Sequence, residues 1–167
     1  MPEVKTDTCV THGQEDTFAL GRALGGCLSR GDCVLLSGDL GTGKSVLARG
    51  IAGALGIEGP MPSPSFTILI PYEGTMKLYH YDLYRLADPD EFYAAGLDEF
   101  LGGDGVCVIE WPEMAELELV PAVDVRIERG AAEDERRIFV CARGIARENM
   151  LWQALTPWRE KSEDTGD

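Results

Sequence analysis

The sequence predicts an α/β domain in three layers, in which a mixed, mostly parallel central sheet is extended by antiparallel strands. Two short apolar runs, 33–37 and 106–109, do not alternate with polar residues, which is typical of parallel strands covered on both faces. Two pairs of strand-like segments joined by short polar turns predict hairpins, which supply the antiparallel strands. Segments with apolar residues at helical spacing alternate with these strands, so the fold class is α/β.

The first half of the chain predicts two helices with a buried strand between them. Thr11 to Gln14 has the spacing of a capping box, and a roughly helical apolar period after it predicts a helix over 15–28. The run 33–37 predicts the strand. From Val46 to Leu55 apolar residues recur at helical spacing, and Gly56 is suited to end that helix.

The middle of the chain predicts a loop, a hairpin and a helix. Prolines exclude a helix over 59–65. The segments 66–72 and 76–82 read as two antiparallel strands around a short turn. The segment 89–101 has a helical pattern, which Gly96 weakens.

The last third predicts a second buried strand over 106–109 and a second hairpin from 123–128 and 137–142, joined by an acidic turn. The segment 145–155 predicts a closing helix, and 156–167 is polar and charged.

The composition is that of one globular domain. The 167 residues, 44% apolar and 26% charged, suit a single domain over 1–156 with a polar, flexible tail over 157–167. No segment has the apolar length of a membrane span, and residues 1–10 lack the apolar centre of a signal peptide, so a cytoplasmic location is expected.

The charge and the cysteines exclude some functions. Fifteen basic and 29 acidic residues give a net charge of −14, which argues against a chain that grips nucleic acid by itself. The acidity either serves solubility or meets a basic protein partner. Five cysteines without a C-x-x-C pair, with only two histidines, argue against a disulfide framework or a zinc site.

Residues 38–45 read GDLGTGKS and fit the phosphate-binding pattern G-x-x-x-x-G-K-[ST] at every constrained position. Glycines let the backbone curl until successive N–H groups face a phosphate, and the helix that follows directs its positive end there. In this pattern Lys44 meets the β and γ phosphates and Ser45 holds Mg²⁺. The predicted nucleotide contacts are Gly38, Asp39, Leu40, Gly41, Thr42, Gly43, Lys44 and Ser45. A strand before the loop and a helix after it argue against a chance match, so the domain is predicted to be P-loop NTPase-like.

Two carboxylates follow predicted strands. Glu110 comes directly after 106–109, and Asp82 ends 76–82. Nucleotide hydrolysis needs a carboxylate that helps to hold Mg²⁺ and a polar group that orients the attacking water. Either acid could instead cap a strand or form an ion pair, but beside a phosphate loop both are candidate catalytic residues.

Four other residues each have two interpretations. Thr67 lies in a hydroxyl-bearing, proline-rich loop, which is either a switch that senses the γ-phosphate or an ordinary turn. Trp111 lies at the mouth of the predicted site or in the core. Arg85 either neutralises transition-state charge or, the favoured reading, pairs with Asp82. His80 shares the sheet face of Asp82, where a packed, hydrogen-bonded histidine is expected.

Together these segments resemble the TsaE family, the bacterial ATPase component of the machinery that makes threonylcarbamoyladenosine in tRNA. The resemblance extends over 11–112, and past Pro112 only the general layout is shared. It depends on the order and spacing of five motifs, which are GDLGTGKS (38–45), SPSFT (63–67), YHYDLYRL (79–86), AGLDEFL (95–101) and VIEWPE (108–113). Serine replaces the more usual threonine at Ser45, where either hydroxyl suits Mg²⁺, and at Ser65, which leaves Thr67 as the switch candidate.

The resemblance implies a protein that binds ATP with Mg²⁺ and hydrolyses it slowly unless it is bound to partners. The implied catalytic site consists of Lys44 and Ser45 for phosphate and metal, Glu110 for the metal, and Asp82, Thr67 and Trp111 for hydrolysis. The family's adenine pocket involves the segment before and within the first helix, which indicates Thr17.

The resemblance also implies two partners, the related proteins TsaB and TsaD, which transfer the threonylcarbamoyl group to adenosine 37 of tRNA. The ATPase is then expected to reset the complex between turnovers and to meet tRNA only indirectly. The acidity of the chain fits this expectation, because the partners and not this chain would grip the tRNA.

Two other functions are compatible with a phosphate loop. A small-molecule kinase would need an arginine-bearing lid, whereas Arg126, Arg129, Arg136 and Arg137 are expected in a hairpin far from the loop. In a nucleotide-gated binding module, ATP would change the affinity for a partner and hydrolysis would be incidental.

Overall fold

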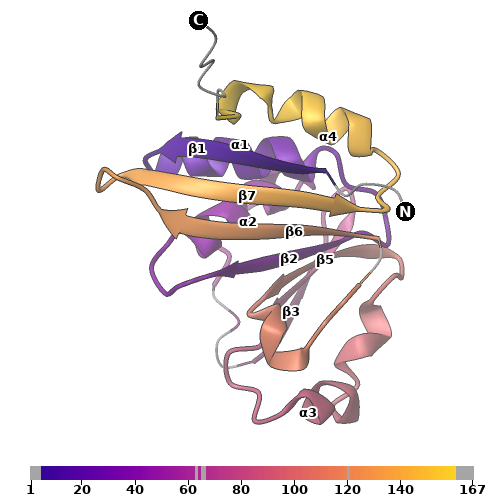
Figure 1. The fold of residues 1–167 in the computed structure, drawn as a ribbon. Helices are drawn as coiled ribbons and strands as arrows, with labels where there is room; N and C mark the ends of the chain where they lie inside the picture. Colours follow the sequence, from indigo (N-terminus) through magenta and orange to yellow (C-terminus); the bar gives the residue numbers. More distant parts are fainter. Residues whose placement is uncertain (1–4, 63, 65–66, 120, 161–167) are drawn as a thin grey trace, which may run out of the picture.

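The computed structural model describes residues 5–62, 64, 67–119 and 121–160, which form a seven-stranded sheet with helices on both faces (Figure 1). The strands are β1 (Thr6–His12), β2 (Cys33–Gly38), β3 (Leu69–Tyr72), β4 (Lys77–Asp82), β5 (Gly105–Glu110), β6 (Ala122–Arg129) and β7 (Glu135–Arg143). The helices are α1 (Gln14–Gly25), α2 (Lys44–Ala54), α3 (Pro89–Ala94) and α4 (Glu148–Ala154), with short 3₁₀ helices η1 (Leu97–Phe100), η2 (Pro112–Ala115) and η3 (Thr156–Trp158).

The strands lie in the order β1-β7-β6-β2-β5-β4-β3. β2 is parallel to β5 and β6, and β4 is parallel to β5. The pairs β1 with β7, β6 with β7, and β3 with β4 are antiparallel. The sheet is therefore mixed and partly parallel, as predicted. Its central strands β6, β2, β5 and β4 are parallel, and antiparallel pairs extend it through β7 and β1 on one side and β3 on the other.

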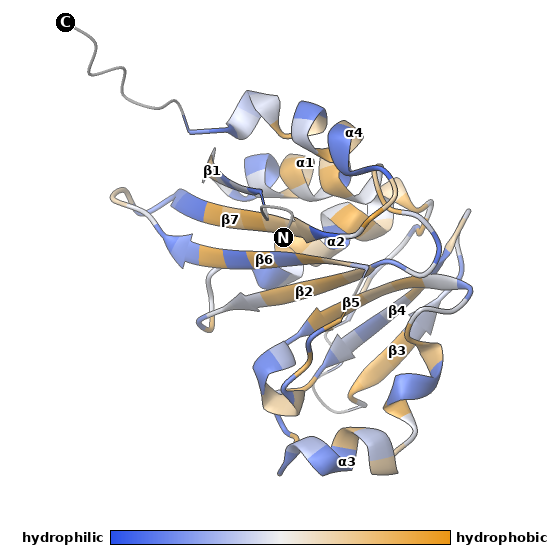
Figure 2. Cartoon of the chain, turned by 45° about the vertical axis from the view of Figure 1, so that its right-hand side comes forward, coloured by the Kyte–Doolittle hydropathy of each residue, from blue (hydrophilic) through white to orange (hydrophobic). Residues whose placement is uncertain are grey.

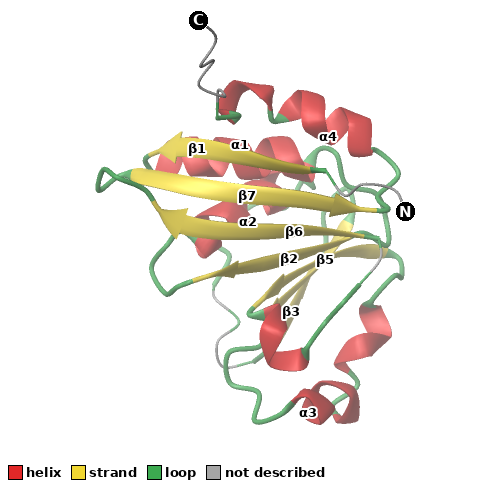
Figure 3. Cartoon of the chain, in the orientation of Figure 1, coloured by secondary structure: helices red, strands yellow, loops and turns green. Residues whose placement is uncertain are grey.

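Two apolar clusters lie on the two faces of the sheet. On one face α1 and α2 pack against each other and on the sheet, and Leu47 of α2 and Val108 of β5 belong to the same cluster (Figure 3). On the other face α3, η1 and η2 cover Tyr81 of β4 and Ile109 of β5. Hydrophobic residues dominate β5 (Figure 2), which is buried along its whole length, as the run 106–109 predicted.

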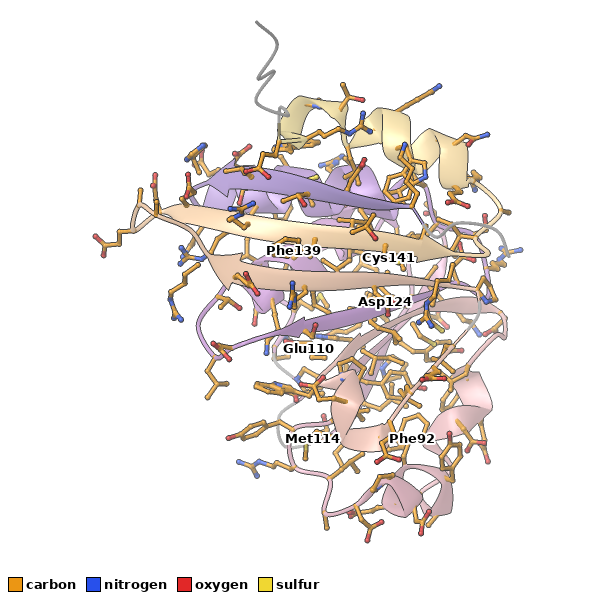
Figure 4. The ribbon with its side chains drawn as sticks, viewed as in Figure 1. Phe92, Glu110, Met114, Asp124, Phe139 and Cys141 are labelled. Carbon is orange, nitrogen blue, oxygen red and sulfur yellow. The ribbon has the colours of Figure 1, made fainter. Side chains whose placement is uncertain are left out.

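The second face is only partly covered by helices. Asp124 of β6 and Phe139 and Cys141 of β7 point out from the sheet on this side (Figure 4) and line a cavity of about 300 Å³. The guanidinium of Arg126 lies 4.6 Å from the Phe139 ring centroid and shields this aromatic ring.

The chain before the first helix forms β1, which the sequence did not predict. Its inward-facing residues are Asp7, Cys9 and Thr11, of which two are polar, so the hydrophobic alternation of a strand is hidden. The predicted capping box is also wrong, because the chain there continues as a strand up to His12. Thr11 lies in this strand, Gly13 is the N-cap without a side-chain cap, and the Thr11 hydroxyl bonds that of Thr17 at 2.7 Å.

The remaining predicted elements are present with shifted ends. The predicted helix over 89–101 divides into α3 and η1 at Gly96, whose φ of 72° lies in the left-handed region. Both predicted hairpins are antiparallel pairs, although the predicted strand 66–72 is observed only from Leu69, and Phe66 is outside the described residues.

The chain after α4 stays in contact with the sheet as far as Glu160, the last described residue. Arg159 pairs with Asp7 at 2.8 Å and bridges to Cys9 of β1, and Trp158 donates its indole N–H to Asp16 at 2.8 Å. No helix in the described part of the chain has the length and apolar character to cross a bilayer.

Candidate functional site

The segment 38–45 forms a tight loop between β2 and α2, as the motif predicts. Gly38 has a φ of 145°, and a Cβ there would lie 2.6 Å from the Ile127 carbonyl oxygen of β6, so only glycine fits. The Thr42 hydroxyl donates to the Asp39 carbonyl at 2.8 Å and closes the loop on itself. The loop is therefore set against both β2 and its neighbour β6.

Lys44 is the buried cation of the site. Its side chain is 6% exposed, and Nζ donates to the Gly38 carbonyl at 2.6 Å and lies 3.7 Å from the Trp111 ring centroid. Burial lowers the pKa of this ammonium, and nearby carboxylates, Glu110 foremost, oppose that shift. A buried ammonium with little water around it is suited to bind an anion strongly.

The N-terminus of α2 provides a second positive feature. This helix has 11 residues and no acid in its first turn, and within the described chain no side chain caps its N-terminus. The partial positive charge and the unpaired N–H groups of its first turn therefore face the loop. Ser45 lies in this first turn and is exposed, so its hydroxyl oxygen is accessible to a metal ion.

Asp82 and Glu110 each lie at the end of a strand, β4 and β5, as the sequence predicted, and the pairing of these strands brings the two residues together. They are direct register partners in this parallel pair, and they are 8% and 5% exposed. Both are close enough to Lys44 to favour its charged form. The backbone N–H of Tyr84 donates to Asp82 Oδ1 at 3.0 Å, which fixes the carboxylate of Asp82. Arg85 is exposed, and its pairing with Asp82 stays a prediction.

Trp111 combines features of both interpretations, because it lines the cavity beside the loop and also packs against the second apolar cluster. Its φ of 58° is unusual for a residue with a side chain, and its backbone N–H donates to the Leu36 carbonyl of β2 at 3.3 Å. The ring is half-buried and lies 4.9 Å from the ring of Tyr84, which is exposed. This backbone conformation places the ring over Lys44, and strained residues of this kind cluster at functional sites.

Thr67 is exposed and lies beside the strand that carries Asp82. Ile68, with a φ of 67°, accepts the backbone N–H of Asp82 at 2.8 Å and donates its own to Pro64 at 2.7 Å. This connects the Thr67 turn to Asp82, and no hydrogen bond joins the Thr67 hydroxyl to another described residue. Ser63, Ser65 and Phe66, the other polar and aromatic residues of the predicted switch loop, lie outside the described residues.

The arginine-bearing hairpin lies beside the phosphate loop, so the expectation that it is far away is wrong. Arg136 Nε donates to the Thr42 carbonyl at 2.8 Å, and Arg129 Nη2 donates to the Leu40 carbonyl at 3.2 Å. The reason is topological: β6 is parallel to β2, so the β6–β7 turn emerges at the same edge as the loop. The sequence could not show this, because it does not say which strand pairs with β2.

Two cavities open on either side of the loop. One of about 580 Å³ is bounded by the loop, Trp111 and the end of β6. The other, of about 250 Å³, is lined by Gly13, Gln14, Thr17, Gly41, Thr42, Gly43, Val46, Asp134 and Arg136. Thr17, expected at the adenine, is thus placed beside the loop, but its hydroxyl is bonded to Thr11, and its methyl group lies toward Gly43. Sequence reasoning missed the contribution of Asp134 and Arg136, which come from the other end of the chain.

His80 is buried and hydrogen-bonded, as its sheet position predicted. Its Nε2 lies 2.7 Å from Glu110 Oε2, and both side chains are almost fully buried. The sequence predicted that His80 shares the face of Asp82, two residues on, and missed that its partner is Glu110 on the next strand.

The described residues contain no cluster of three or more His, Cys, Asp or Glu side chains that could hold a metal unaided. One hydroxyl and one carboxylate, from Ser45 and Glu110, fit Mg²⁺ that is bound together with a nucleotide, because this ion uses one or two carboxylates along with substrate phosphates and water. Ser45 and Glu110 are the residues that would hold it.

The sequence and the structure of this chain are similar to those of known proteins. The family model "Threonylcarbamoyl adenosine biosynthesis protein TsaE" matches residues 11–138. The protein named tRNA threonylcarbamoyladenosine biosynthesis protein TsaE from Treponema pallidum (strain Nichols) is 42% identical over 79% of this chain and 98% of its own. Its namesake from Bacillus subtilis (strain 168) is 38% identical over 87% of this chain and 91% of its own. A crystal structure of YdiB from Bacillus subtilis superposes with a TM-score of 0.76 at 35% identity and covers 94% of this chain and 98% of that one.

Proposed function

Because this chain belongs to the TsaE family of threonylcarbamoyladenosine biosynthesis proteins, we propose that it is the P-loop ATPase of tRNA N6-threonylcarbamoyladenosine synthesis, with Mg²⁺ as its metal. The observation that carries the proposal is the buried Lys44 beside the register pair Asp82 and Glu110. A phosphate loop alone binds nucleotide, whereas two carboxylates at adjacent strand ends add what hydrolysis requires.

Each group has a distinct role in this proposal. The backbone N–H groups of 38–45 and the Lys44 ammonium bind the phosphates, and Ser45 and Glu110 hold the metal. When bound, Mg²⁺ neutralises charge that develops on the phosphoryl oxygens. Asp82 is proposed to accept a hydrogen bond from the attacking water, and the bond that its carboxylate receives from the Tyr84 N–H supports this role by restricting its movement. Thr67 and Trp111 contribute to hydrolysis, Thr67 from the turn joined to Asp82.

The nucleoside part of ATP is assigned to the cavity of about 250 Å³ that Thr17 and Arg136 line. The Thr17 methyl group and Val46 supply apolar surface for a base, and Gln14 and Asp134 supply polar groups. This cavity joins the loop at Gly41 and Gly43, so a nucleotide can reach it while its phosphates stay on Lys44.

The protein is proposed to act through partners of the TsaB and TsaD type and to meet tRNA only through them. A net charge of −14 repels a polyanion, so isolated protein is expected to bind tRNA weakly. Tight, salt-resistant binding of tRNA by this chain alone would contradict this part of the proposal.

The deciding experiment measures free phosphate, phosphorylated metabolites and modified adenosine together. The chain is incubated with Mg²⁺ and ATP alone, and then with its partners and tRNA. Slow release of phosphate that accelerates in the complete mixture, together with modified adenosine, supports the proposal. A phosphorylated metabolite would support a kinase instead, and negligible hydrolysis in the complete mixture would support a nucleotide-gated module.

A further inference from the structure

His80 and Glu110 form a buried polar pair between adjacent strands. Since a carboxylate accepts, the ring N–H at Nε2 donates to Glu110 Oε2 across 2.7 Å. The other ring nitrogen, Nδ1, is buried without a hydrogen-bond partner in the described structure. Among the described residues, the imidazole ring of His80 therefore forms a hydrogen bond with Glu110 alone.

Glu110 has a competing partner in Lys44. Lys44 Nζ lies 3.7 Å from the ring centroid of Trp111, the residue that follows Glu110 in the chain, so the ammonium is near this strand end. The charge of Glu110 accordingly acts to raise the pKa of Lys44. Nevertheless, the ion pairs within 4.0 Å in the described part of the chain do not include Lys44 with Glu110. A buried carboxylate that could turn would move toward a nearby ammonium, because the attraction between the two charges is strong where water is scarce.

We propose that His80 is a positioning residue that holds Glu110 for Mg²⁺ and keeps it from closing on Lys44. The bond uses Oε2 and leaves Oε1 for the metal or a water bound to it. At the same time Lys44 stays available to phosphate. Hydrogen bonds that orient metal-ligating side chains commonly contribute ten- to a hundredfold to metal affinity. The inference rests on the proposed Mg²⁺ and ATP site, and it assigns to this histidine a role beyond packing.

The test is the ratio of the two dissociation constants of the ATP analogue AMP-PNP, measured in EDTA and in Mg²⁺. This ratio reports the metal contribution, and general damage to the fold cancels in it. His80→Asn keeps a polar side chain that is too short to reach Glu110, and His80→Phe keeps the ring without a donor. Both are expected to lower the ratio about tenfold and to leave binding in EDTA within about threefold of the wild type.

Two controls separate positioning from packing. His80→Gln places an amide N–H near the position of Nε2 and is expected to restore the ratio to within about threefold of the wild type. His12→Asn makes the same chemical change at the exposed histidine of β1 and is expected to have no effect. In a Glu110→Gln background, adding His80→Asn is expected to lower the ratio no further, since coupled residues are not additive.

The outcomes are distinct. If His80→Asn and His80→Phe both retain the wild-type ratio, or weaken binding equally in EDTA and in Mg²⁺, the positioning role is overturned while the proposed site stands. If the wild-type protein itself binds AMP-PNP no better with Mg²⁺ than without it, the proposed metal site fails, and this inference fails with it. Either His80 variant that folds is sufficient for the comparison.

Discussion

The parallel and antiparallel halves of the sheet contribute different things to the site. The parallel strands β2, β4 and β5 lead directly to Lys44, Asp82 and Glu110, which are the charged groups of the proposed chemistry. The antiparallel hairpin of β6 and β7 instead directs Arg129 and Arg136 to carbonyl oxygens of the phosphate loop. In the proposed chemistry, one half therefore holds the reacting groups, and the other half supports the phosphate loop through its hydrogen bonds.

The difference follows from strand direction. Parallel strands end at one edge, so side chains that follow each of them converge there. β6 belongs to both halves, since it is parallel to β2 and antiparallel to β7. Because of this position, the turn between β6 and β7 lies at the same edge of the sheet as the phosphate loop. If the division is correct, substitutions in the parallel half should abolish activity and those in the hairpin should only weaken binding.

Lys44→Ala should have the largest effect and tests the parallel half most severely. It removes the buried ammonium that would bind phosphate, a charge-assisted contact worth about 3 kcal/mol, which corresponds to roughly a hundredfold in ATP affinity. Removing the same charge from the transition state should lower turnover by a further factor of roughly one hundred. Calorimetric ATP titration and phosphate release with partners measure the two effects. Unchanged ATP affinity would exclude Lys44 from the site.

Asp82→Asn should separate hydrolysis from binding. The amide keeps the shape of the carboxylate but cannot act as a base, so turnover with partners should fall roughly a hundredfold or more. ATP affinity should stay within about threefold, because Asp82 is not assigned to the phosphates. Asp98→Asn, at an exposed acid of η1, is the matched control and should retain wild-type turnover. Equal turnover in the two variants would remove Asp82 from the proposed chemistry.

The pH dependence of ATP binding should expose the burial of Lys44. Because burial lowers its pKa below the ordinary 10.5, the ammonium loses its proton at a lower pH than an exposed lysine does. ATP affinity should therefore fall as the pH rises through that lowered pKa, by at most about tenfold per pH unit above it. In the absence of ATP, the contribution of Lys44 to the free energy of unfolding should instead increase as the pH rises through the lowered pKa. The reason is that the folded chain binds this proton less well than the unfolded chain does. Lys44→Arg stays charged, so its ATP affinity, measured from pH 7 to 10, should be flatter.

The sequence predicted the parallel half better than the antiparallel half, for physical reasons. Strands buried on both faces are continuous apolar runs, and the glycine pattern of 38–45 is dictated by phosphate geometry, so both are visible locally. β1 was missed because Asp7 and Thr11 occupy inward positions, where they are satisfied by Arg159 and Thr17 from distant segments.

Pairings between distant strands could not be predicted from the sequence. The approach of Arg136 to Thr42 depends on β6 lying next to β2, and the bond from His80 to Glu110 depends on the register of β4 with β5. Sequence periodicity gives the face on which a side chain lies but not the neighbour across it. The candidate residues were therefore predictable, and the contacts that orient them were not.

Arg136→Ala should have the smallest effect and tests the hairpin half. It removes the donor to the Thr42 carbonyl and part of the wall of the 250 Å³ cavity. The phosphate loop should therefore be less stable in its observed conformation by about 1 kcal/mol. ATP affinity should fall roughly fivefold, and turnover at saturating ATP should stay within about twofold, because the reacting groups lie in the other half. Arg137→Ala is the control. Its guanidinium pairs with Glu160 across 2.9 Å, away from the loop, and its loss should leave ATP affinity unchanged. A fall in saturated turnover of tenfold or more for Arg136→Ala would break the division, since it would place an arginine of the hairpin among the groups that act on the transferred phosphoryl group.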